Sequence, residues 1–214
     1  IAYSKRDKGN HIITTKVEHP AVLNTCKYLQ KEGFEVTYLD VDPNGLISLD
    51  ELKKAITPKT ILITVMYANN ETGVLFPVQE IGEIAKEKGV TFHTDAVQAA
   101  GKIKIDLQKL NCDLMTISGH KLYGPKGIGA LFARRGVRLV PLIHGGHHER
   151  NRRGGTENVP GIVGFGKAAE IAVRDMDKEI THLQTLKERL EKGMLERVPH
   201  IKVNGHVDKR LPNT

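Results

Sequence analysis

The sequence predicts an α/β domain with a mainly parallel sheet flanked by helices, and three observations indicate this fold. Short β-branched runs of strand length alternate with amphipathic segments at helical spacing. The order βαβαβ of the first of these segments implies parallel strands. The 214 residues, 39% hydrophobic and 27% charged, are enough for a large domain with a substantial core, so disorder is not expected.

The first half of the chain supplies the βαβαβ order. The segments are expected over residues 11–16 (strand), 20–31 (helix), 34–39 (strand), 49–56 (helix) and 61–66 (strand). An Asp-Pro-Asn-Gly turn at 42–45 separates the second strand from the second helix. Ser48 and Glu51 have the S-x-x-E spacing of a capping box, so this helix should begin directly after Ser48.

The second half continues the alternation. A helix is expected to begin at Pro77 and to run to about Lys88, because Gly89 ends it. The apolar residues in 90–92 lead into His-Thr-Asp at 93–95. Further strands are expected over 113–117, 128–133 and 138–142.

A change of pattern marks the last part of the chain. Apolar residues at helical spacing from Pro160 to Met194 predict one long or broken helix, and its second half has the charged pattern of a surface connector. We therefore place a domain boundary near Val173. Residues 1–172 are expected to form the large domain, and residues 173–214 a connector helix and the start of a smaller one.

Charge, hydropathy and cysteine count limit the function classes. The 32 basic and 25 acidic residues give +7, but the charge is dispersed and only five Phe and five Tyr could stack on bases, so nucleic-acid binding is not expected. The apolar runs have strand length and no signal peptide is readable, so no membrane anchor is expected. Two cysteines make no disulfide framework, which favours a reducing, cytoplasmic compartment. The chain begins with Ile1 rather than Met and ends abruptly at Thr214, which suggests a fragment.

Polar residues follow four of the predicted strands. They are Glu18-His19, Asn69-Asn70-Glu71, Asp95 with Gln98, and Ser118-Gly119-His120-Lys121. Ligands of open α/β sheets bind beyond the carboxyl ends of the strands, so these residues form the candidate site. His19, His93, Asp95 and His120 could also be drawn together as metal ligands, but no pair has a zinc-like spacing and no thiolate joins them, so no metal is expected.

Lys121 is the candidate nucleophile. Its polar, Gly-rich loop with cationic neighbours can lower the pKa of an amine and make it a Schiff-base nucleophile, although it could also be a solvated loop lysine. Asp95, with Gln98 three residues later, favours the interpretation of Lys121 as a nucleophile, because pyridoxal enzymes pair their lysine with an acid that binds the pyridinium nitrogen. Asp95 could also be the N-cap of a helix starting at Ala96, and His19 a helix cap or surface residue.

Five motifs, in order along nearly the whole chain, resemble the cysteine desulfurases of the NifS/IscS group. They are His-Ile-Ile-Thr-Thr at 11–15 with Glu-His-Pro-Ala-Val-Leu at 18–23, Asn-Asn-Glu-Thr-Gly at 69–73, His-Thr-Asp-Ala-Val-Gln at 93–98, Ser-Gly-His-Lys-Leu-Tyr-Gly-Pro-Lys-Gly at 118–127, and Arg-Gly-Gly-Thr-Glu-Asn at 153–158. The resemblance implies the large domain of a fold-type I, class V pyridoxal phosphate transferase, followed by the start of a smaller α+β C-terminal domain. It also implies a homodimer.

The resemblance assigns catalytic roles to two residues. Lys121 would form the Schiff base with pyridoxal 5′-phosphate and, once displaced by substrate, shuttle a proton. His19 would stack on the ring face and take part in proton transfer. Asp95 would bind the ring nitrogen and keep it protonated.

The same resemblance implies the remaining contacts of the cofactor. Gln98 would bond to its phenolic oxygen, and Asn70 would lie near that oxygen or the substrate carboxylate. Ser118 and His120 would hold the phosphate. Thr156 would reach the phosphate of the partner subunit.

The implied reaction removes sulfur from L-cysteine to give L-alanine and an enzyme persulfide, which feeds iron–sulfur cluster assembly through a scaffold or other acceptor protein. The family's attacking cysteine would lie beyond this sequence. Cys26 shares a helical face with apolar residues and Cys112 precedes a strand, so both are expected to be core residues and the fragment alone inactive. Another class V enzyme, such as a selenocysteine lyase or an aminotransferase, and an inactive truncated interaction module are the alternatives.

Overall fold

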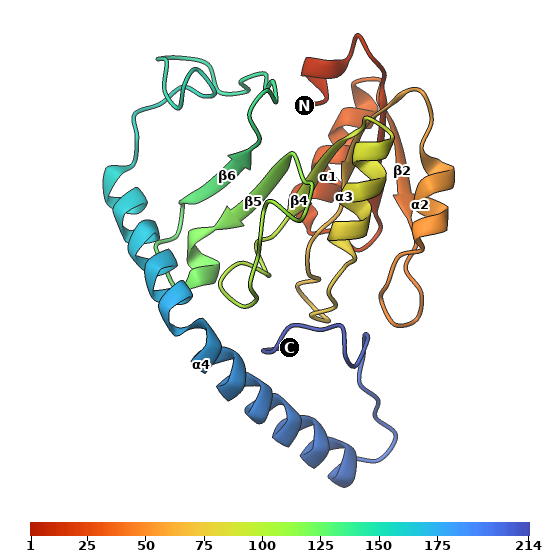
Figure 1. Cartoon of the computed structure of the whole chain (residues 1–214), viewed down its shortest axis with the longest axis vertical. Helices are drawn as coiled ribbons and strands as arrows, with labels where there is room; N and C mark the ends of the chain where they lie inside the picture. The colour runs from red at the N-terminus through yellow and green to blue at the C-terminus, as the bar shows by residue number, and fades with distance from the viewer.

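A six-stranded sheet forms the centre of the protein, and the computed structural model describes it together with every residue from 1 to 214 (Figure 1). The strands lie in the order β2-β1-β3-β4-β5-β6. The first five run parallel, and β6 is antiparallel to β5. Their bounds are β1 His11–Thr15, β2 Glu35–Leu39, β3 Thr60–Thr64, β4 Thr91–Asp95, β5 Leu114–Ser118 and β6 Gly129–Ala133. The predicted α/β fold is confirmed.

Helices connect the first four parallel strands, as the predicted order requires. The helices are α1 Pro20–Lys31, α2 Leu49–Ala55, α3 Val78–Glu87 and α4 Val159–Arg197, with short 3-10 helices η1 Tyr3–Lys5 and η2 Gly119–Leu122. The bounds of the first three α-helices agree with the sequence prediction to within about one residue, which is the usual uncertainty of a helix end. No helix combines the length and the apolar character that a membrane crossing requires.

Side-chain caps begin the first two helices at the predicted places. The Ala21 amide donates a hydrogen bond to Nδ1 of His19 at 3.2 Å, so His19 is the N-cap of α1. The Glu51 amide donates to Ser48 Oγ at 3.3 Å ahead of α2. The Glu51 carboxylate pairs with Lys54 at 2.9 Å. Only half of the predicted capping box therefore forms.

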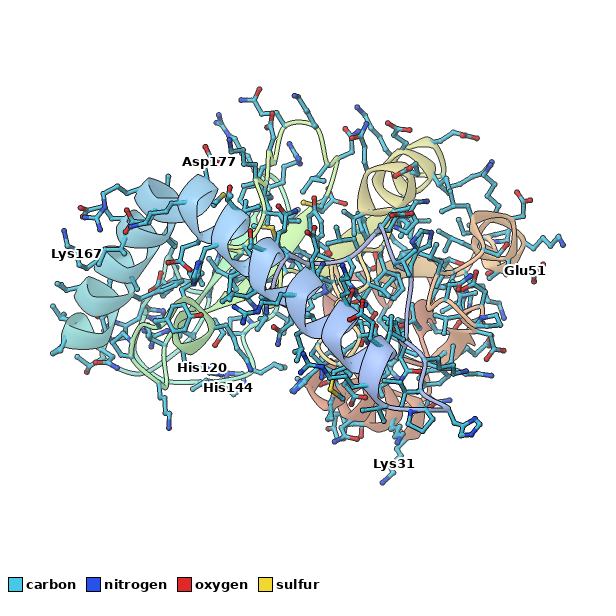
Figure 2. All side chains as sticks on the ribbon, turned by 90° about the horizontal axis from the view of Figure 1, so that it is seen from below. Lys31, Glu51, His120, His144, Lys167 and Asp177 are labelled. Atoms are coloured by element: carbon cyan, nitrogen blue, oxygen red, sulfur yellow. The ribbon has the colours of Figure 1, made fainter.

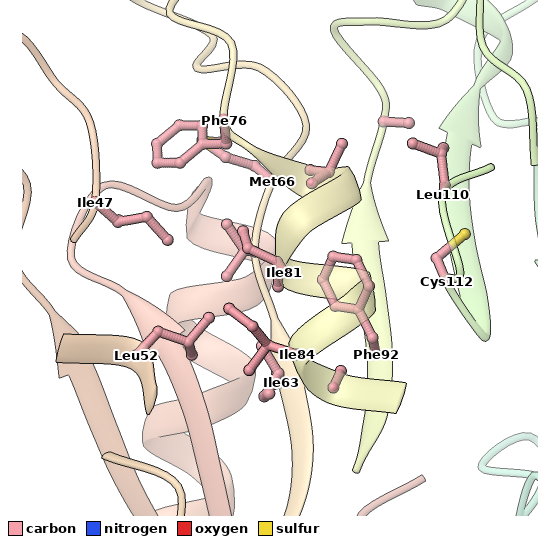
Figure 3. Packing of buried hydrophobic residues seen from close by; sticks show 14 of the residues in the cluster. Ile47, Leu52, Ile63, Met66, Phe76, Ile81, Ile84, Phe92, Leu110 and Cys112 are labelled. Carbon is pink, nitrogen blue, oxygen red and sulfur yellow. The ribbon is translucent and has the colours of Figure 1, made fainter. Parts of the chain in front are cut away.

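Adjacent residues of β1 contribute to separate cores, because successive strand side chains point to opposite faces of a sheet. Ile12 packs in a small cluster with Cys26 and Leu29 of α1. Ile13 belongs to the larger cluster, which includes the buried faces of α2 and α3 and is shown in Figure 3. Cys26 is 3% exposed and Cys112 lies fully buried in the larger cluster, so both thiols are confirmed as core residues.

The strand expected over residues 138–142 is wrong, because this segment has no regular structure. β6 pairs only with β5 and is the last strand of the sheet. Pro141 lacks the amide hydrogen that a further strand would donate, and Leu142 is 74% exposed. The β-branched and leucine residues that suggested a strand lie instead in the long loop at the top of Figure 1.

The last part of the chain forms one continuous 39-residue helix, α4, so the long helix is confirmed and the broken one is not. Its N-cap is Asn158, whose Oδ1 accepts from the Gly161 amide at 3.1 Å. Figure 2 shows α4 and the segment that follows it lying across the rest of the molecule. In this segment the Leu211 amide bonds to Gly73 O at 2.9 Å and the Leu211 side chain joins the larger core. The boundary near Val173 stays a prediction.

A buried carboxylate joins the turn after β1 to the end of β3. Glu18 is 4% exposed, and its Oε1 accepts from Thr15 Oγ1 at 3.0 Å and from the Met66 amide at 2.8 Å. Its Oε2 has no partner. Burial raises the pKa of Glu18 to about 7, the two hydrogen bonds lower it, and the charge of Asp95 adds to the increase.

We predict that the free energy of unfolding of Glu18→Gln, measured relative to that of the parent, increases as the pH rises. At pH below the ordinary pKa of 4.5, Glu18 is protonated in both states. Between 4.5 and about 7 the unfolded chain loses this proton first, so the contribution of Glu18 to the free energy of unfolding falls as pH rises. Gln cannot ionise, and the difference between Glu18→Gln and parent should grow by roughly 2 kcal/mol from pH 5 to pH 8 in urea unfolding.

The control is Glu80→Gln, which removes an exposed carboxylate from α3. Equal pH dependence of the Glu18→Gln variant and the parent would contradict a buried, destabilised carboxylate.

A second prediction concerns the close approach of α3 to the loop before β5. A Cβ at Gly82 would overlap the carbonyl oxygen of Leu110. Gly82→Ala should therefore lower the free energy of unfolding by about 1–3 kcal/mol, although Ala favours a helix by about 1 kcal/mol. The matched variant Gly166→Ala in α4, where no atom lies within 4 Å, should instead stabilise. Urea unfolding of both variants measures the difference, and two stabilising changes would contradict the packing.

Candidate functional site

A cavity of about 340 Å³ opens at the carboxyl ends of four neighbouring parallel strands. Its lining residues are His19, Ala21, Met66, Ala68, Asn70, Asp95, Val97, Gln98, Ser118, His120 and Lys121. Every residue to which the resemblance assigned a role, except Thr156, is in this set. Glu18, Asn69, Glu71 and Gly119, which also follow the strands, are not. Four of the five sequence motifs, which are distributed over about a hundred residues, therefore meet in one place.

Each strand brings one part of the cavity. His19 follows β1, Asn70 follows β3, Asp95 is the last residue of β4, and Ser118 is the last residue of β5. Because β1, β3, β4 and β5 are parallel neighbours, their carboxyl ends lie at the same edge of the sheet. The topology alone thus gathers these side chains.

Asp95 serves both as a turn residue and as a cavity residue. Its Oδ1 accepts from the Val97 amide at 2.9 Å, but residues 97–102 form turns, so Asp95 caps a turn and not the helix at Ala96 that the sequence left open. Burial raises the pKa of the Asp95 carboxyl above its ordinary value, and the bond from Val97 and the charge of His19 lower it. A carboxylate at this position can accept a hydrogen bond from a protonated ring nitrogen.

The lysine loop is held by a short helix and one side-chain bond. Ser118 Oγ and His120 Nδ1 are 2.8 Å apart, so each fixes the other at the start of η2. Lys121 is exposed at the outer side of the cavity. A second cation, Lys102, lies near Lys121. Burial is the main cause that lowers the pKa of Lys102, and the positive charge of Lys121 lowers it further.

The two neighbouring amides of the Asn-Asn pair have different tasks. Asn69 Oδ1 accepts from the amides of Glu71 at 3.0 Å and Thr72 at 2.9 Å, so Asn69 builds the turn. Asn70 lines the cavity. Gln98 also lines it, and its Oε1 accepts from Lys102 Nζ at 3.0 Å.

His93, which the metal hypothesis included, does not face the cavity. Its Nδ1 lies 2.8 Å from Thr64 Oγ1 and its Nε2 lies 3.3 Å from Thr116 Oγ1, so the ring bridges three strands. Burial lowers the pKa of His93 to about 4, which keeps the ring neutral. No group of three His, Cys, Asp or Glu side chains is arranged to hold a metal.

Thr156 lies outside the cavity, on the exposed loop after β6. His148 Nδ1 and Glu157 Oε1, 2.8 Å apart, brace this loop. In Figure 1 the loop is at the top of the view, whereas η2 and the ends of the parallel strands are lower. The contact that the sequence assigned to Thr156 requires a second subunit and stays a prediction.

Sequence reasoning missed the apolar wall of the cavity. Met66 and Ala68 precede Asn70 at alternate positions and line the cavity with it. This period of two, continued past the end of β3, was the signal that could have found them. Lys102 was also missed, because its four-residue spacing from Gln98 resembles an ordinary surface pair.

Comparisons with known proteins agree with this geometry. The model of the family described as "Aminotransferase class-V" matches residues 1–214. The chain is 54% identical over 215 residues to "Cysteine desulfurase IscS" of Clostridium botulinum strain Hall, covering 100% of this chain and 54% of that protein. It is 56% identical over 213 residues to "Cysteine desulfurase IscS" of Methanosarcina thermophila, covering 100% of this chain and 52% of that protein.

Solved structures extend the likeness to the fold. A "NifS-like protein" superposes with a TM-score of 0.94 at 43% identity, over 99% of this chain and 58% of that one. DndA from Streptomyces lividans superposes with a TM-score of 0.89 at 37% identity, over 98% of this chain and 60% of that one. The chain spans about half the length of the curated relatives it matches. Because the family model matches every residue, the protein belongs to the class-V aminotransferase family, as the five motifs predicted.

Proposed function

We propose that the intact protein containing this chain is a cysteine desulfurase that removes sulfur from L-cysteine and releases L-alanine. The observation that carries the proposal is the meeting of Lys121, Asp95, His19 and Gln98 around one cavity. The names of the relatives support the same reaction. The sulfur would pass on to an iron–sulfur scaffold or another acceptor protein, and the cytoplasm would be the site of action.

The cavity suits pyridoxal 5′-phosphate, the cofactor of this family. It combines an amine, a carboxylate, two imidazoles and two amides with an apolar wall that includes Met66 and Ala68. A flat, partly charged ring with an anionic arm needs this combination of partners. When bound, the cofactor supplies an electron sink for the substrate's α-carbon.

We assign the proton chemistry to three residues. Lys121 Nζ would hold the cofactor covalently and then carry a proton to and from the substrate's α-carbon. The Asp95 carboxylate would hold a proton on the ring nitrogen. The hydrogen bond from Ala21 to Nδ1 of His19 leaves the proton of the neutral imidazole on Nε2, so His19 would present an N–H against the ring or substrate.

The remaining polar residues would orient the cofactor. Gln98 would bond to the phenolic oxygen of the ring, and Asn70 would lie near that oxygen or the substrate carboxylate. Ser118 and His120 already lie 2.8 Å apart, and together they would hold the phosphate. Thr156 would complete the phosphate site of the other subunit in a homodimer.

The sulfur-accepting thiol would come from outside these residues. Cys26 and Cys112 are both buried. Burial raises the pKa of Cys26 to about 11, so it stays a thiol and not the nucleophilic thiolate. A cysteine thiolate from elsewhere in the intact protein would attack the substrate sulfur and keep it as a persulfide, and the carbon skeleton would leave as L-alanine.

We predict that Lys121→Ala in the intact protein removes the covalent link to the cofactor. Borohydride reduction followed by intact mass should add the cofactor to the parent and not to the variant. L-alanine formation should fall by about three orders of magnitude, as expected when a positioned proton carrier is lost. The control is Lys126→Ala, which changes an exposed lysine of the same loop outside the cavity.

Product identification tests the reaction itself. The intact protein, loaded with cofactor and given L-cysteine and a thiol reductant, should release alanine and sulfide in equal amounts. Keto-acid formation would identify an aminotransferase instead, and turnover of L-selenocysteine without L-cysteine would identify a selenocysteine lyase. Absence of turnover and of covalent cofactor would leave an interaction module.

A further inference from the structure

We propose that Lys102 is a positioning residue that fixes which end of the Gln98 amide faces the cavity. The inference rests on the proposed function, because it concerns the same cofactor site. Lys102 is not in the set of residues that line this cavity. It would act on the cofactor through Gln98.

Both residues lie in the turns that follow β4. The amides of Ala99 and Ala100 donate to Ala96 O at 3.0 and 2.9 Å, and the Lys102 amide donates to Ala99 O at 3.0 Å. These bonds form successive turns and not a helix, and Gly101, directly before Lys102, has a positive φ of 74°. Lys102 Nζ donates to Gln98 Oε1 at 3.0 Å.

The chemistry of the two groups decides the orientation of the amide. An ammonium group only donates hydrogen bonds, whereas the amide of Gln98 has an accepting oxygen and a donating NH₂ group. The oxygen must therefore turn to Lys102, and the NH₂ group is left for the cavity. A donor at this position suits an anionic oxygen, such as the phenolic oxygen of the proposed cofactor.

Stability does not explain a lysine at position 102. The side chain is partly buried in a second cavity of about 180 Å³, between η2 and α4, where Lys121 is its neighbour. Burial and the positive charge of Lys121 both lower the pKa of Lys102, so its charged form is disfavoured there. Asp175 and Glu179 of α4 line the same cavity, and no ion pair joins either of them to Lys102.

Lys102→Met in the intact holoenzyme tests the inference. The parent should bind the cofactor with a visible absorption band, and failure at this point would concern the proposed function, not Lys102. In Lys102→Met the thermal midpoint should be equal to or higher than that of the parent. The visible band should shift, and the dissociation constant of the cofactor should rise about five-fold, as for the loss of one hydrogen bond.

Three further variants make the result specific. Lys102→Arg keeps a charged donor and should restore the band. In a Gln98→Ala background Lys102→Met should cause no further shift, because Lys102 acts through this amide. Lys104→Met, which removes an exposed lysine paired with Asp177 at 2.8 Å, should leave the band unchanged. An unshifted band in Lys102→Met, or an equal shift without Gln98, would overturn the inference.

Discussion

The parallel arrangement of β1, β3, β4 and β5 is the constraint on which the site depends. Each of these strands runs the same way, so the chain leaves all four at one edge of the sheet. The residues that follow them, from His19 to Lys121, are far apart in sequence and adjacent in space. An antiparallel neighbour would place its final residue at the opposite edge, as β6 does after β5.

The bonds that form the turns also orient the chemical groups. His19 begins α1 by accepting the Ala21 amide, and the same bond sets the tautomer of its ring. Asp95 caps the turn through one oxygen and faces the cavity. For both residues a capping bond and a place at the cavity are therefore compatible. Glu18 supports this edge through the Met66 amide, although the burial of its carboxyl is unfavourable at neutral pH.

The segment after α4 packs against the larger core of the sheet. Leu211 is buried in the larger core, and Arg210 beside it is paired with Glu191 of α4. The Leu211 amide also bonds to Gly73 O, so the end of the chain contacts a turn that is distant in sequence. Local pattern could not predict these contacts, because a short irregular segment carries no periodicity that identifies its partner.

The sequence by itself determined the first three helices, the strands that form the parallel part of the sheet and most of the polar residues of the cavity. Hydrophobic spacing and capping residues act within a few positions, and the motifs carried the family resemblance. Only the tertiary structure decided that 138–142 is not a strand, that His93 bridges strands beside the site, and that Lys102 bonds to Gln98. Strand formation depends on a free neighbouring strand, and the role of a polar side chain depends on which partners the folded chain brings to it.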